Sequence, residues 1–186
     1  MLISMIKYPV TTLGPGKRIG IWTQGCGRQC KGCMSRHSWE YDPQAERSVE
    51  WIIDVVRYYS EKYEVDGITI SGGEPFDQAD LTHLLSALAH YGHGDVLLYT
   101  GYYIDELKAY TEALENVSVL IDGPYVDELN DNMPLRGSSN QNVYVLKQEY
   151  AERYMEYLQK PRCFDVDVEN GIMTVIGLLP ASEGNG

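Results

Sequence analysis

Short apolar runs alternate along this chain with stretches in which apolar residues recur at the spacing of one helix face. The helical spacing spans residues 48–62, 78–90 and 103–115, and each stretch is expected to form a helix. Ser48 and Asp77 precede the first two and are expected to cap them. The apolar runs predict strands at 19–23, 67–71, 95–100 and 117–122.

The order of these elements predicts an α/β fold. Strands that alternate with helices are typical of βαβ units and a parallel sheet, whose ligands bind at the carboxyl ends of the strands. Segments rich in glycine or cysteine follow four predicted strands, after Thr23, Ser71, Thr100 and Asp122. We therefore expect these segments to share one site.

The two ends of the chain are less regular. Residues 1–18 carry turn signals, at Pro9 and at Gly14, Pro15 and Gly16. After a loop over 123–141, the pattern predicts a strand at 143–146, a helix near 147–159 and strands at 164–168 and 172–176. Residues 181–186 are expected to be a disordered tail, which leaves 1–180 as a single domain.

Composition and charge exclude several classes of protein. The chain has 186 residues, of which 44% are hydrophobic and 23% charged, as in ordinary globular proteins, and it is too short for a complete eight-unit barrel of about 250 residues. A net charge of −12 argues against binding to nucleic acid or to an anionic membrane surface. No apolar run approaches a membrane span, and the first residues do not resemble a signal peptide, so the expected location is the cytoplasm.

Three of the four cysteines lie within eight residues, as Cys26, Cys30 and Cys33 in a C-x3-C-x2-C pattern. Such clustering indicates metal ligands or redox groups. Three thiolates leave one iron of a [4Fe–4S] cluster open to another ligand. With His37 the loop also offers a Cys3His set for structural zinc, and spacing alone leaves both possibilities open. Cys163 is distant in sequence and is expected to be a buried or half-buried structural thiol.

A second motif places Gly72, Gly73, Glu74 and Pro75 at the end of a predicted strand. Two glycines allow a ligand to approach the backbone closely, where their carbonyls can accept hydrogen bonds from an ammonium group, and Glu74 adds negative charge. Alone, the motif also fits a plain β–α turn. A structural zinc site has no use for such a turn, so the two motifs together favour the iron–sulfur interpretation.

The cysteine loop followed by the GGEP turn resembles the radical S-adenosylmethionine superfamily. Within it, the chain resembles the glycyl-radical-enzyme activating family, in the branch that serves anaerobic ribonucleotide reductases. The similar segments run in order over residues 8–142: YPVTTLGPGKR, WTQGCGRQCKGCMS, SGGEP, YTGYYIDEL, VLIDGPYV and LRGSSNQ.

This resemblance implies a shortened, open (β/α) barrel of about six mainly parallel strands. It also implies that Cys26, Cys30 and Cys33 hold a [4Fe–4S] cluster whose open iron binds S-adenosylmethionine. Reductive cleavage would give methionine and a 5′-deoxyadenosyl radical, which would take hydrogen from a glycine of a partner enzyme, foremost an anaerobic ribonucleotide reductase. A one-electron donor such as a flavodoxin would reduce the cluster.

The resemblance also implies cofactor-binding residues. Gly32 and Met34 are expected to lie against the adenine, and Gly72, Gly73 and Glu74 to take the methionine ammonium. Thr100 and Gly101 are expected to line the same cavity.

Two residues of the LRGSSNQ segment leave more than one interpretation. Arg136 and Asn140 either orient the cofactor carboxylate, shape the partner surface, or brace a loop. The resemblance fades after Gln141, so residues 143–180 leave the identity of the partner open.

Two other functions fit the same motifs. A small radical S-adenosylmethionine enzyme acting on a small molecule or peptide would use identical radical-forming residues. A zinc or iron–sulfur binding module without enzymatic activity would not cleave S-adenosylmethionine.

Overall fold

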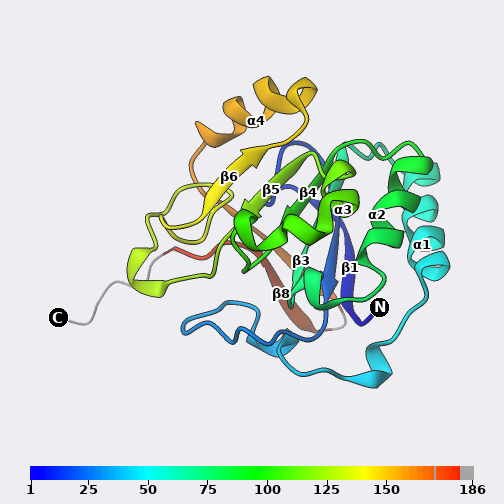
Figure 1. The fold of residues 1–186 in the computed structure, drawn as a ribbon, viewed down its shortest axis with the longest axis horizontal. Helices are drawn as coiled ribbons and strands as arrows, with labels where there is room; N and C mark the ends of the chain where they lie inside the picture. The colour runs from blue at the N-terminus through cyan, green and yellow to red at the C-terminus, as the bar shows by residue number, and fades with distance from the viewer. Residues whose placement is uncertain (170, 181–186) are drawn as a thin grey trace.

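A computed structural model describes residues 1–169 and 171–180, so the predicted tail lies outside the described residues. Six strands form one sheet in the order in which they occur in the chain (Figure 1). Their bounds are Ile3–Val10 (β1), Arg18–Thr23 (β2), Gly67–Gly72 (β3), Val96–Tyr99 (β4), Val119–Asp122 (β5) and Asn142–Val145 (β6).

The inner strands β2, β3, β4 and β5 are parallel, whereas β1 and β6 run antiparallel at the two edges. The α/β class and the open, mainly parallel arrangement are therefore confirmed. Strand β1 is an additional strand, which the turn signals of residues 1–18 did not indicate. Its Pro9 lies near the end of an edge strand, where a missing N–H leaves no inner neighbour unpaired.

Helices cover one face of the sheet. These are α1 (Val49–Lys62), α2 (Leu81–His90) and α3 (Thr111–Glu115), and their apolar side chains join alternate strand residues in the largest hydrophobic cluster (Figure 1). The Ser48 side chain accepts a hydrogen bond from the Trp51 N–H, which confirms it as the cap of α1. The segment predicted as one helix over 103–115 is instead a 3-10 helix, Ile104–Tyr110, followed by α3.

The predicted cap at Asp77 is wrong. A 3-10 turn, Pro75–Asp77, intervenes, and α2 begins only at Leu81. The Asp77 carboxylate instead accepts hydrogen bonds from the hydroxyls of Tyr41 and Tyr102. It therefore joins the cysteine loop to the segment after β4.

The opposite face of the sheet is covered by C-terminal elements. Helix α4 (Ala151–Leu158) packs over β4 and β5, and the strand β8 (Ile172–Gly177) packs near β1 and β2. Strand β8 pairs only with β7 (Phe164–Glu169) among the described strands. Cys163 directly precedes this hairpin and is exposed, so the expectation of a buried thiol is wrong. None of the helices described here is long and apolar enough to cross a membrane.

Candidate active site

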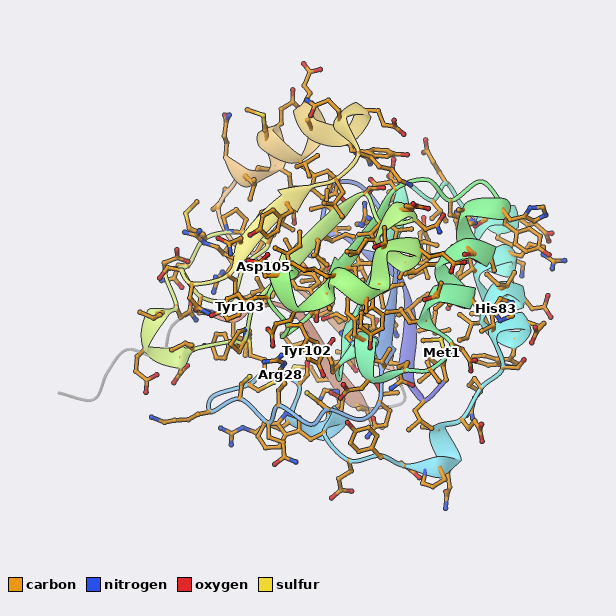
Figure 2. All side chains as sticks on the ribbon, in the orientation of Figure 1. Met1, Arg28, His83, Tyr102, Tyr103 and Asp105 are labelled. Atoms are coloured by element: carbon orange, nitrogen blue, oxygen red, sulfur yellow. The ribbon has the colours of Figure 1, made fainter. Side chains whose placement is uncertain are left out.

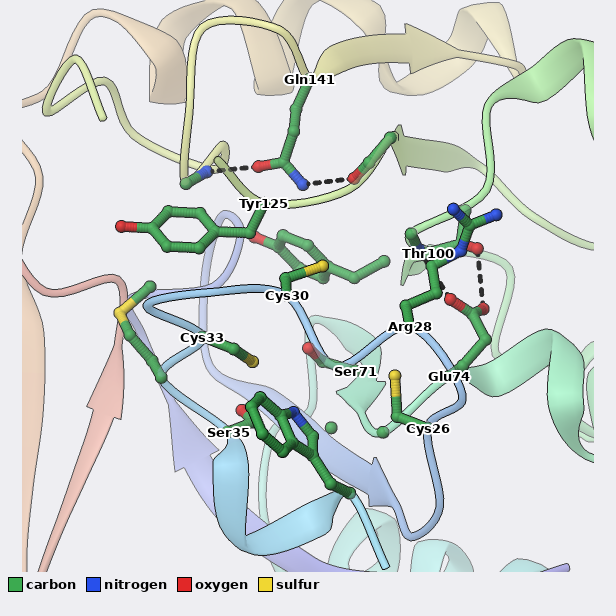
Figure 3. A pocket seen from close by; sticks show the side chains of 18 of the residues that line it. Cys26, Arg28, Cys30, Cys33, Ser35, Ser71, Glu74, Thr100, Tyr125 and Gln141 are labelled. Atoms are coloured by element: carbon green, nitrogen blue, oxygen red, sulfur yellow. Dashed lines mark hydrogen bonds between the residues drawn. The ribbon is translucent and has the colours of Figure 1, made fainter. Parts of the chain in front are cut away.

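A pocket opens where the predicted shared site was expected, at the carboxyl ends of β2, β3, β4 and β5 (Figure 3). The segment after each of these strands contributes to its lining, and the loop before β6 closes one side. The sheet thus brings together motifs that are far apart in sequence, from Cys26 to Gln141.

Cys26, Cys30 and Cys33 are free, partly buried, and all line this pocket (Figure 3). Burial raises the pKa of the Cys26 thiol, and hydrogen bonds from the backbone of Arg28 and Gln29 oppose that shift. Iron bound at this position would be held by the Cys26 thiolate, so the thiol would lose its proton on binding. Three unpaired thiols facing one pocket are the donor set that a cluster with one open iron requires.

The zinc alternative needs His37 beside these thiols, but His37 is exposed and does not line the cysteine pocket. Within residues 1–169 and 171–180, no three His, Cys, Asp or Glu side chains converge closely enough to hold a single metal ion. A cluster of four irons places its three thiolates on three different irons, so it needs no such convergence.

The GGEP turn presses directly against the cysteine loop. The Gly73 N–H donates to the Thr23 carbonyl at 2.8 Å, and the Glu74 N–H donates to the Gly25 carbonyl at 2.8 Å. A Cβ atom on Gly73 would lie 2.2 Å from the Gly25 oxygen. Position 73 therefore requires glycine because the backbones of the GGEP turn and the cysteine loop are in direct contact there. This requirement is separate from any close approach of a ligand.

Glu74 is buried and accepts hydrogen bonds from three donors of the protein. Its carboxylate accepts from the Thr100 hydroxyl at 2.7 Å, the Gly101 N–H at 2.7 Å and the Phe76 N–H at 3.1 Å. Burial raises the pKa of Glu74, and these three donors oppose the shift. Glu74, Thr100 and Gly101 all line the pocket, so the structure brings this part of the predicted site together.

The other predicted residues divide into two groups. Met34 lines the pocket, and its sulfur accepts a hydrogen bond from the Leu179 N–H at 3.0 Å. Gly32 packs against Asp127 and is outside the lining. Arg136 and Asn140 are also outside it: Arg136 forms an ion pair with Asp131, and the Asn140 amide donates to the Pro124 carbonyl at 2.8 Å. These last contacts favour the loop-bracing interpretation.

The same loop contributes Gln141, which the sequence analysis did not select. Its side-chain oxygen accepts from the Gly137 N–H at 2.7 Å, and its amide donates to the Gly123 carbonyl at 2.8 Å (Figure 3). Gln141 thereby joins the segment after β5 to the strand β6. Its place in the quoted LRGSSNQ segment was the available signal.

Arg28 also escaped the sequence analysis, although it lies between two of the cysteines. Among the residues that the structure describes, it is the only Arg or Lys that lines the pocket. Arg28 lies beside Tyr102 (Figure 2). Its guanidinium is 4.0 Å from the centre of the Tyr102 ring, and one of its nitrogens is 3.4 Å from a Glu106 carboxylate oxygen. The Nε–H is buried without a hydrogen-bond partner. This donor is available to a bound anion.

Comparisons with known proteins agree with this site. Residues 12–144 match the family described as a 4Fe-4S single cluster domain. The chain is 31% identical over 150 residues to the anaerobic ribonucleoside-triphosphate reductase-activating protein of Escherichia coli strain K12, covering 75% of this chain and 96% of that protein. The protein of the same description from Enterobacteria phage T4 is 30% identical over 135 residues, covering 70% and 85%.

A more distant relative is the pyruvate formate-lyase-activating enzyme of Listeria monocytogenes, 36% identical over 72 residues, or 38% of this chain and 29% of that enzyme. The domain match and the site define an iron–sulfur protein of the radical S-adenosylmethionine class. The chain belongs, within that class, to the family of anaerobic ribonucleoside-triphosphate reductase-activating proteins. The resemblance found in the motifs is thus confirmed, and the module without enzymatic activity is not supported.

Proposed function

We propose that this chain generates a glycyl radical on an anaerobic ribonucleoside-triphosphate reductase. One observation carries the proposal: three free thiols and a glycine-lined cradle from successive strands face a single pocket. The two relatives that align with most of this chain are both described as activating proteins of the anaerobic ribonucleoside-triphosphate reductase, which supports this reductase as the partner.

Cys26, Cys30 and Cys33 would hold three irons of a [4Fe–4S] cluster, and the residues around them would hold S-adenosylmethionine. When bound, these two groups supply one electron and the 5′-deoxyadenosyl radical that removes hydrogen from a glycine. The residues of the chain would bind these two groups, orient them and shield them from solvent. Gly73 and Gly101 keep the cradle open, since a Cβ on Gly101 would lie 2.5 Å from the Arg28 side chain.

Glu74 holds the cradle in shape by fixing the end of β3 to Thr100 and Gly101 at the end of β4. Its negative charge at the pocket wall favours the methionine ammonium, which supports the role that the resemblance implies. Arg28 supplies the opposite charge. Its unpartnered Nε–H is suited to the methionine carboxylate, because hydrogen bonds between charged groups are the strong ones.

The reaction also needs an electron donor and a compartment that holds both proteins. A one-electron donor of the flavodoxin kind would reduce the cluster, and the cytoplasm is the expected location of both proteins. The acidic surface, with net charge −12, favours partner surfaces that are neutral or basic.

The test is anaerobic reconstitution with iron and sulfide, followed by reduction with S-adenosylmethionine and the anaerobic reductase. We expect an electron paramagnetic resonance signal of a glycyl radical on the reductase, and none with Cys30→Ala. Cleavage of S-adenosylmethionine that leaves the reductase without a radical would contradict the proposal and favour a small-molecule or peptide substrate.

A further inference from the structure

The C-terminal hairpin lies beyond the part of the chain that matches the family model, which ends at residue 144. It is nevertheless firmly attached to the sheet. The Asp165 carboxylate accepts hydrogen bonds from the Thr11 N–H at 2.8 Å and the Thr11 hydroxyl at 2.7 Å. Asp167 forms an ion pair with Lys7, and Ile176 is buried in the cluster with Trp22.

A second cavity, of about 520 Å³, lies between this hairpin and the sheet. Seven consecutive residues, 173–179, line it, and no residue of β7 does. Consecutive residues of a strand point to opposite faces, so a cavity that touches all of them runs along the edge of the strand. The cavity therefore follows the edge of β8 that faces away from β7.

That edge has no strand beside it within residues 1–169 and 171–180, because β8 pairs only with β7. The last pair of the β7–β8 ladder is Glu169 and Ile172, with two residues of sequence between them. In a hairpin with a two-residue connection, the pair next to the turn is a hydrogen-bonded pair. Pairs alternate along an antiparallel ladder. Val166 and Val175 are consequently a non-hydrogen-bonded pair, and the Val175 N–H and carbonyl point toward the cavity.

The second cavity lies next to the cysteine pocket. Five residues line both: Met34, Ser35, Ser71, Tyr99 and Leu178. Of the described residues that line the second cavity, none is Asp, Glu, Lys or Arg. An uncharged polypeptide segment placed along β8 would thus reach residues that also line the cysteine pocket.

We infer that the glycine-bearing segment of the partner enzyme binds in extended form along the free edge of β8, as an added strand. This inference rests on the proposed function and names how the partner is recognised. An unpaired strand edge offers backbone donors and acceptors at regular spacing, which is how many domains capture extended peptides. The apolar wall, with Met5, Leu13 and Trp22, would favour uncharged side chains on either side of the glycine.

The test compares Val175→Pro with Val166→Pro, using the anaerobic reductase as the partner. The two valines face each other in the register and are 42% and 54% exposed, so the substitutions disturb the hairpin to a similar degree. Only Val175→Pro removes an N–H from the edge that lines the cavity. We expect it to raise the KM for the reductase about tenfold, while Val166→Pro changes it less than twofold.

Cleavage of S-adenosylmethionine without partner is expected to remain in both variants. Equal KM values for the two variants, with radical formation by the wild-type chain, would overturn the strand addition and leave the proposed function intact. A wild-type chain that cleaves S-adenosylmethionine and forms no radical on the reductase would overturn the proposed function itself.

Hydrogen exchange on the wild-type chain gives a second measurement that needs no variant. We expect the reductase to slow exchange over 173–179 and to leave 164–168 unchanged. Unchanged exchange over 173–179 in the complex would contradict the inference. Slower exchange that depends only on the concentration of this chain would assign the edge to a second copy instead.

Discussion

The Thr100 hydroxyl donates a 2.7 Å hydrogen bond to the buried Glu74 carboxylate, and this contact joins the ends of two neighbouring parallel strands. The Gly101 N–H donates to the other oxygen of the same carboxylate. The wall of the pocket is therefore held by a buried charge with three donors around it. Removing one donor leaves this charge less well compensated.

Thr100→Val is expected to lower the free energy of unfolding by about 1–3 kcal/mol, because a buried acceptor loses its partner. It should also raise the KM for S-adenosylmethionine. Thr100→Ser keeps the hydroxyl and is the matched control. Equal unfolding free energies for the two variants in urea titrations would show that the contact does not support the pocket.

The same variant gives a pH dependence. Burial already raises the pKa of Glu74 above its usual 4.5, and loss of the Thr100 donor raises it further. A raised folded-state pKa means that the native state holds the proton more tightly, so stability is lost as pH rises through the interval between the unfolded and folded values. The difference between wild type and Thr100→Val should be larger at pH 8 than at pH 4. A difference that shrinks as pH rises would contradict this.

Gly73→Ala is expected to disrupt the cysteine loop, since its Cβ would lie 2.2 Å from the Gly25 carbonyl oxygen. Gly27→Ala is the control, because a Cβ there makes only ordinary contacts at 3.6 Å and beyond. Iron content after anaerobic reconstitution and binding of S-adenosylmethionine by calorimetry should fall for Gly73→Ala alone. Normal binding and iron content in that variant would show that the loop can move aside.

The cysteines should separate into two groups. Alanine at Cys26, Cys30 or Cys33 should abolish the normal cluster of about four irons per chain, which iron and sulfide analysis measures. Cys163→Ala should leave the cluster unchanged, because Cys163 is exposed and outside the pocket lining. Loss of the cluster in Cys163→Ala would show that it supplies a ligand.

Arg28→Met should raise the KM for S-adenosylmethionine about 10- to 100-fold, the equivalent of about 1.5–3 kcal/mol for a hydrogen bond to a charged group. Arg28→Lys keeps the charge and should recover part of the loss. Iron content should remain unchanged in both variants. If Arg28→Met leaves the KM unchanged, the guanidinium serves only to stack on Tyr102.

Local periodicity and motif spacing were sufficient for the parallel sheet, the cap at Ser48 and the convergence of four strand ends. They were insufficient where contacts between residues far apart in sequence determine whether a strand forms or what a side chain binds. Strand β1 is stabilised by pairing with β2, and turn signals near Pro9 obscured it. Asp77 looked like a helix cap, but its carboxylate is used by Tyr41 and Tyr102.

Within the site, the motifs identified the three cysteines and the GGEP turn, whereas Arg28 and Gln141 became visible only in three dimensions. Nothing in the sequence next to Arg28 shows that Tyr102, more than seventy residues away, lies against its guanidinium. Gln141 was inside a quoted segment, yet the choice among its neighbours depends on which side chain bridges Gly123 and Gly137.

The central claim is that a 5′-deoxyadenosyl radical formed in the pocket removes hydrogen from a glycine of the anaerobic reductase. The most direct measurement uses reductase labelled with deuterium at its glycine α-carbons, mixed anaerobically with the reduced, reconstituted chain and S-adenosylmethionine. We expect deuterium in the 5′-deoxyadenosine, in an amount that matches the glycyl radical spins on the reductase. Unlabelled 5′-deoxyadenosine, formed while the reductase acquires no spin, would contradict the claim.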